Sequence, residues 1–99
     1  MPDGSQVPGC YSLYILSCAD GSLYTGIALD VSQRLRQHEE GRNGAKYLRG
    51  RQPFKLVFEE VIGDRSEASR AEYRLKRLSR ADKLSLIAGS VSLSELAVT

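Results

Sequence analysis

The sequence contains no tryptophan, one histidine, one methionine and two cysteines. Cys10, Cys18 and the single His38 cannot together complete a zinc site of the usual kind. The cysteines flank or sit in one expected strand, and a disulfide would strain a strand that runs directly from one to the other. We therefore expect reduced thiols in a cytoplasmic protein.

The sequence also lacks a long apolar run, since none approaches the roughly 20 residues that a membrane-spanning helix needs. Residues 1–9 contain no lysine, arginine or apolar segment, so we expect no secretory signal and no membrane contact. Their prolines and glycines predict a flexible leader. The remaining chain predicts one domain over residues 10–89 and a C-terminal tail over residues 90–99, which forms one last helical turn or frays.

Basic residues are absent from the first 33 positions, which carry three acids. Residues 34–55 hold seven basic residues against two acids, and residues 65–83 hold seven against three. Ten of the fourteen basic residues are arginines, whose planar forks pair with phosphate oxygens. This charge distribution suits a polyanion partner and, equally, a solvated helix surface.

The chain is organised around a predicted β-hairpin. Residues 11–17 and 22–28 are rich in tyrosine, isoleucine and leucine, and the turn dipeptide Asp20-Gly21 separates them.

Two hairpin registers are open. A two-residue loop pairs Ser17 with Tyr24 and puts Tyr14 and Tyr24 on opposite faces of the sheet. A three-residue loop with a left-handed glycine pairs Leu16 with Tyr24 and Tyr14 with Gly26. Only the second register puts both tyrosines on one face.

A helix is predicted from Asp30, whose carboxylate can cap it, to about Glu40. Arg34 borders the inward stripe of this helix. The stripe consists of Val31, Leu35 and His38. The basic segment 41–51 follows, with one helical turn expected around Lys46 to Arg49. Its three glycines either let the backbone approach a ligand or simply make a loop.

The third strand is predicted over residues 54–62 and ends at Gly63. Strict alternation would divide its side chains between two faces. Those faces are Leu56, Phe58 and Glu60 on one side and Val57, Glu59 and Val61 on the other.

Asp64 and Glu67 have the spacing of a capping box and predict the start of a long helix. Its apolar stripe consists of Ala68, Ala71, Leu75 and Leu78. Glu72 lies inside this stripe, where a carboxylate is costly unless it is paired or binds a cation. An ion pair with an arginine is the alternative to a functional role. A shorter helix is expected over residues 80–88, closed by Gly89.

Several of these positions resemble the GIY-YIG nuclease superfamily. Ser12-Leu13-Tyr14 stands in the place of the GIY triplet and Tyr24-Thr25-Gly26 in the place of YIG. Arg34, His38 and Glu72 follow in the order of the family. The resemblance extends over about residues 11–88 and is closest to small stand-alone members, which residues 44–50 and 63–66 also resemble. The chain departs at Ser12 and in lacking a targeting domain.

The resemblance implies an α+β fold, with a three-stranded antiparallel sheet flanked by helices in the order β-β-α-β-α-α. It also implies a DNA endonuclease with one divalent metal ion, Mg²⁺ or Mn²⁺. The implied roles are general base for Tyr14, positioning for Tyr24, phosphate pairing for Arg34, support for His38, metal ligand for Glu72, and nucleic-acid contacts for Lys46, Arg49 and Arg51.

Two other functions remain open. One is a nucleic-acid-binding module with vestigial or partner-dependent catalysis. The other is a protein-interaction domain whose arginines bind acidic surfaces. A protein partner could supply the targeting that a bare domain lacks.

Overall fold

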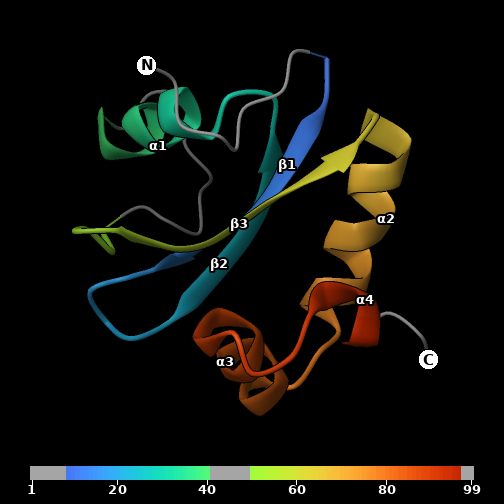
Figure 1. Ribbon diagram of the computed structural model, residues 1–99. Coiled ribbons are helices and arrows are strands. Elements are labelled where there is room, and N and C mark those ends of the chain that lie inside the picture. The colour runs from blue at the N-terminus through green and yellow to red at the C-terminus, as the bar shows by residue number, and fades with distance from the viewer. Residues whose placement is uncertain (1–8, 41–49, 97–99) are drawn as a thin grey trace.

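The computed structural model describes residues 9–40 and 50–96. Its elements follow the predicted order, with one short helix added in the expected tail (Figure 1). They are β1 (Tyr11–Ser17), β2 (Leu23–Ala28), α1 (Val31–Glu40), β3 (Lys55–Gly63), α2 (Arg65–Lys76), α3 (Arg80–Ala88) and α4 (Leu93–Leu96). The α+β prediction is therefore confirmed, and no helix in the described ranges is long and apolar enough to cross a membrane.

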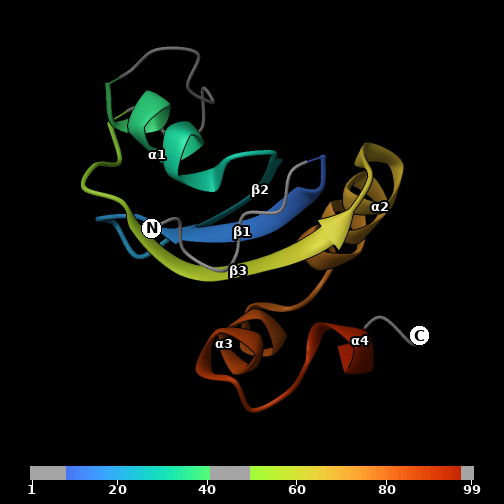
Figure 2. The same ribbon diagram turned by 45° about the horizontal axis from the view of Figure 1, so that its top comes forward.

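The three strands form an antiparallel sheet in the order β2-β1-β3. Helix α1 covers one face, and α2 and α3 lie on the other side (Figure 2). The core consequently has two parts. Tyr14 and Leu16 pack with Val31 of α1, whereas Leu13 and Ile15 join the cluster that contains residues of α2 and α3.

The hairpin adopts the three-residue loop. Leu16 pairs with Tyr24 and Tyr14 with Gly26, so both tyrosines lie on the α1 face of the sheet. Gly21 has φ 85°, the left-handed conformation that this loop requires. Its amide donates to the Cys18 carbonyl at 2.9 Å. Cys10 and Cys18 are both free.

The predicted faces of β3 are wrong because the strand contains a β-bulge. Ile15 of β1 pairs with Phe58, but the next residue, Leu16, pairs with Leu56. The inserted Val57 therefore puts Leu56 and Phe58 on opposite faces. Leu56 packs in the cluster below α1, and Phe58 packs in the cluster below α2 and α3.

Local signals set the helix boundaries. The Asp64 carboxylate accepts from the Glu67 amide at 2.8 Å, and the Glu67 carboxylate accepts from the Asp64 amide at 3.1 Å. This is the predicted capping box. Gly89 closes α3 in the left-handed conformation, as predicted.

Candidate active site

Tyr14 lies at the centre of the α1 face of the sheet. Its side chain is 1% exposed, and its hydroxyl lies 3.1 Å from Nε2 of His38 on α1. Gly26, opposite Tyr14 on β2, leaves room for the phenol. A Cβ on Gly26 would lie 2.6 Å from the Tyr14 hydroxyl oxygen. The missing side chain of Gly26 therefore permits the position of Tyr14.

Tyr24 completes a triangle of rings. Its centroid lies 6.4 Å from that of Tyr14 and 5.7 Å from that of His38, with an edge-on geometry in the second pair. Such contacts restrain aromatic side chains. His38 is 3% exposed, and its Nδ1 has no hydrogen-bond partner among the described residues. Two strands and one helix thus bring three titratable rings together.

Arg34 lies one turn before His38 on α1. Its Nη1 donates to Oε1 of Gln37 at 3.2 Å. Hydrogen bonding and charge from Arg34 lower the pKa of Tyr14, although they do not outweigh burial. Arg34 is therefore close enough to influence the tyrosine hydroxyl, as the hypothesis for this site requires.

Glu72 comes from α2, whose apolar stripe packs on the other face of the sheet. Its side chain is 24% exposed, and Oε2 lies 3.2 Å from Nζ of Lys76. The sequence hypothesis considered an ion pair with arginine, but the partner is this lysine one turn later. Desolvation is the main cause of the raised pKa of both Tyr14 and Tyr24, and the charge of Glu72 is a lesser cause in the same direction. Five predicted residues from four elements therefore share one neighbourhood.

Burial dominates the protonation of the rings. Desolvation, reinforced by Tyr24, raises the pKa of Tyr14 to about 12. Desolvation also raises the pKa of Tyr24. The pKa of His38 is lowered, first by desolvation and then by the Arg34 charge. At neutral pH the site therefore contains two neutral phenols and a neutral imidazole.

The residues fit a metal ion held by few protein ligands. Within the part of the chain that the structure describes, no three His, Cys, Asp or Glu side chains cluster as a metal cage. Glu72 nevertheless supplies a partly exposed carboxylate whose charge acts on both tyrosines. Mg²⁺ commonly binds through one or two carboxylates, keeps several waters and takes further oxygens from phosphate. Such an ion would have to compete with Lys76 for Glu72.

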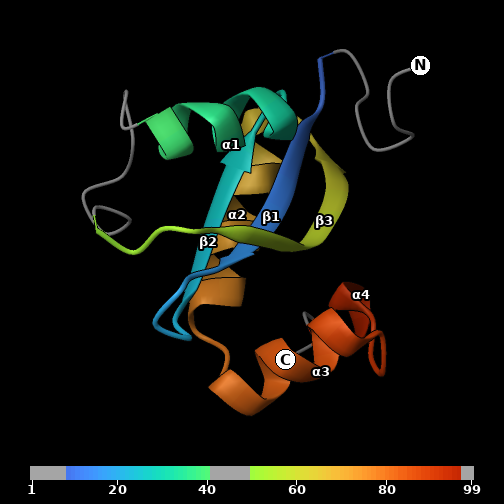
Figure 3. The same ribbon diagram turned by 90° about the vertical axis from the view of Figure 1, so that its left-hand side faces the viewer.

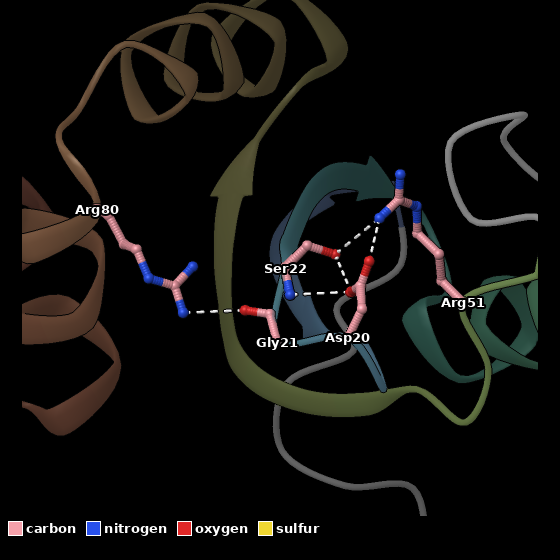
Figure 4. A network of polar contacts seen from close by, with 5 residues as sticks. All are labelled: Asp20, Gly21, Ser22, Arg51 and Arg80. Carbon is pink, nitrogen blue, oxygen red and sulfur yellow. Dashed lines mark hydrogen bonds and ion pairs between the residues drawn. The ribbon is translucent and has the colours of Figure 1, made fainter.

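The three predicted nucleic-acid contacts are only partly visible. Lys46 and Arg49 lie outside the described residues. Arg51 donates from Nη1 to the Asp20 carboxylate in the hairpin loop (Figure 4). The Arg51 carbonyl accepts from the Ala19 amide at 3.0 Å. Arg80 donates from Nη2 to the Gly21 carbonyl of the same loop at 2.9 Å (Figure 4). Arg51 thus anchors the hairpin in this structure.

Sequence reasoning missed two neighbours of the site. Gln37 accepts from Arg34, and Lys76 pairs with Glu72. Both lie at helical spacings of three and four residues, at which side chains on one helix meet. That spacing is the signal that could have found them.

The fold and this group of residues define a class of small α+β domain with tyrosines on one sheet face and a helix carboxylate whose charge acts on them. The chain matches the GIY-YIG catalytic domain over residues 10–85 and belongs to this family of nucleases, which act on nucleic acid, generally DNA.

The relatives are small proteins of similar length. The chain is 48% identical over 84 residues to a UPF0213 protein of Cronobacter sakazakii, covering 85% of this chain and 87% of the relative. It is 40% identical over 99 residues to the UPF0213 protein VC_A0739 of Vibrio cholerae, covering 99% and 97%. The solution structure of the UPF0213 protein BH0048 of Bacillus halodurans is 43% identical, with a TM-score of 0.53 and coverage of 90% and 94%.

Proposed function

We propose that this protein is a metal-dependent endonuclease that hydrolyses phosphodiester bonds of DNA, with selection by DNA structure in repair or recombination. The carrying observation is the 3.1 Å contact between the Tyr14 hydroxyl and His38 Nε2, beside Tyr24. Arg34 and Glu72 supply the positive charge and the carboxylate that this chemistry needs. The active unit of the proposal is residues 10–89, acting in the cytoplasm.

In this mechanism Tyr14 takes a proton from the attacking water. A phenol with a pKa of about 12 is a poor base at pH 7. The neutral His38 offers Nε2 as an acceptor for the Tyr14 proton at hydrogen-bond distance. The positive charge of Arg34 acts in the same direction, because it favours the tyrosinate.

The other side chains position the phosphate. Tyr24 directs its hydroxyl at the water or at a phosphate oxygen, and Arg34 pairs with the scissile phosphate as negative charge develops. Glu72 would hold the ion, Mg²⁺ or Mn²⁺. When bound, this ion neutralises the phosphate and stabilises the leaving oxygen. Lys46, Arg49 and Arg51 contact the nucleic-acid backbone in this proposal, with Arg51 exchanging Asp20 for phosphate.

One observation favours a second function. Tyr14 is almost completely buried and its pKa is raised, which are properties of a structural tyrosine as well as of an inactive base. The second candidate is therefore a nucleic-acid-binding module whose catalysis is vestigial or needs a protein partner.

A cleavage assay tests both candidates. Single-stranded, duplex and branched DNA are incubated with Mg²⁺, Mn²⁺ or EDTA and with wild type, Tyr14→Phe or Glu72→Gln. We expect metal-dependent cutting that falls at least about 100-fold in either variant, with nucleic-acid binding mostly retained. Tyr73→Phe is the matched control, because Tyr73 lies on α2 and is 61% exposed.

The outcomes separate the candidates. Cutting at the wild-type rate by Glu72→Gln would remove Glu72 as metal ligand. Tight, salt-sensitive binding without cutting would favour the binding module. A wild-type protein that neither binds nor cuts any of the three DNA forms would contradict both.

A further inference from the structure

An open pocket of about 370 Å³ adjoins the candidate active site at one end of the sheet. β1 begins at this end, whereas β2 and β3 end there (Figure 3). The starts of α1 and α2 complete the walls. The volume lies within the range of about 300–1,000 Å³ that is usual for small-ligand pockets. The polar part of the lining is Asp30, Gln33, Arg34, Gln37 and Arg65.

Arg34 connects this pocket with the active site. It lines the pocket, and its hydrogen bonding and charge also act on the Tyr14 hydroxyl. If the scissile phosphate of a DNA strand pairs with Arg34, the neighbouring nucleotide of that DNA strand lies one backbone unit away. The pocket is the adjoining space in which that nucleotide can lie.

Arg65 gives the pocket a second guanidinium. It is the first residue of α2, is exposed, and has no ion-pair partner within the described part of the chain. The acid in the lining, Asp30, is already engaged, because its carboxylate accepts from the Gln33 amide at 3.0 Å. An unpaired arginine beside a second arginine is suited to the oxygens of a phosphodiester.

The remaining lining suits a nucleoside. Tyr11 and the 48%-exposed Leu29 offer aromatic and apolar surface, on which a base or sugar can pack. The side-chain amides of Gln33 and Gln37 can donate to base or sugar oxygens, and the Nε2 of Gln37 can do this while its Oε1 accepts from Arg34.

We propose that this pocket binds the nucleotide next to the scissile phosphate, and that Arg65 binds the phosphate on the far side of that nucleotide. The assignment rests on the nuclease function proposed above and adds a subsite to it. Arg65 is then a substrate-binding residue with no part in the chemical step.

The test compares Arg65→Gln with Arg70→Gln, which removes a likewise exposed arginine from the same helix outside this pocket. Binding to a DNA oligonucleotide is measured in EDTA at several salt concentrations. We expect Arg65→Gln to weaken binding about tenfold and to lower the salt slope by about 1. In the cleavage assay KM rises while kcat stays within about twofold of wild type.

Uncharged methylphosphonate linkages, placed one at a time along the oligonucleotide, locate the contact. A methylphosphonate one nucleotide from the cut should weaken DNA binding by the wild type and by Arg70→Gln. It should not weaken binding by Arg65→Gln any further. If wild type binds and cuts but Arg65→Gln behaves as Arg70→Gln, the pocket assignment is overturned and the nuclease function stands. If wild type neither binds nor cuts, both fail.

Discussion

At the scale of single residues, the unusual feature is a tyrosine that is fully enclosed with its polar end inside. A buried hydroxyl is costly without a partner, and His38 provides that partner to Tyr14. The histidine is equally enclosed, which keeps it neutral. The contact therefore satisfies the Tyr14 hydroxyl and His38 Nε2, whereas His38 Nδ1 has no hydrogen-bond partner among the described residues.

This enclosure predicts an alkaline loss of stability. The folded-state pKa of Tyr14, about 12, lies above its ordinary 10.0, so the folded protein holds this proton more tightly than the unfolded chain. The contribution of this proton to the free energy of unfolding is complete below pH 10 and disappears as pH rises from 10 towards 12. Urea unfolding across this range should show a loss in wild type that exceeds the loss in Tyr14→Phe by about 2–3 kcal/mol.

Tyr73→Phe is the control for that measurement, because Tyr73 is 61% exposed. Its unfolding free energy should fall with pH as in wild type. Equal alkaline losses in Tyr14→Phe and wild type would show that the proton of Tyr14 is not held by the fold.

At the scale of elements, the pairing of β1 with β2 controls the site. The loop length decides that Tyr14 faces Gly26 and that Tyr24 lies on the same face. Strand alternation alone does not choose between registers, since the same sequence permits a two-residue and a three-residue loop. Gly26 is useful in this register because it lies directly beneath the phenol.

Gly26→Ala should therefore displace Tyr14. The new methyl would lie 2.6 Å from the hydroxyl oxygen and 2.7 Å from Cζ, and the ring has no free space to enter because Tyr14 is 1% exposed. We expect a loss of about 1–3 kcal/mol in unfolding free energy and a loss of cleavage that exceeds the loss of folded protein.

Gly89→Ala is the control that separates the effect of backbone strain from the effect of displacing Tyr14. Gly89 has φ 81°, and a methyl group added to it would meet no atom within 4 Å, so alanine there costs about 1 kcal/mol of backbone strain. It should keep full cleavage by the folded fraction. Full cleavage by folded Gly26→Ala as well would mean that Tyr14 needs no fixed position.

At the scale of the whole molecule, charge is segregated along the chain. All lysines and arginines lie between Arg34 and Lys83. This part of the sequence includes α2 and most of α1, the helices that carry Arg34, His38 and Glu72. Relatives that align over nearly their whole length are of similar size.

We expect DNA binding that weakens steeply as salt rises, because phosphate contacts release counterions. Lys46→Ala combined with Arg49→Ala should weaken binding and reduce the slope of log affinity against log salt by about 2 if both touch phosphate. Binding by filter retention or fluorescence anisotropy measures this. A charge-matched control is Arg70→Ala with Arg74→Ala on α2, and an unchanged slope in the first pair would exclude the segment as a phosphate contact.

The sequence by itself determined the order of the main elements and several of their ends. The Asp64–Glu67 capping box, the Gly89 terminus and the stripe of α2 depend on residues within a few positions, which local hydrogen bonding and periodicity can specify. The resemblance then put the candidate residues in order. Only the tertiary structure decided the rest, because it depends on contacts between distant segments.

Three features show this. The hairpin register, left open by the sequence, is the three-residue form. The bulge at Val57 puts Leu56 and Phe58, expected on one face of β3, on opposite faces, because the pairing with β1 inserts a residue that alternation does not predict. The close approach of Tyr14 to Gly26 and His38 exists only once two strands and a helix have packed. Local hydrogen bonding and periodicity therefore determined the helices and strands, and long-range packing determined the position of the Tyr14 hydroxyl.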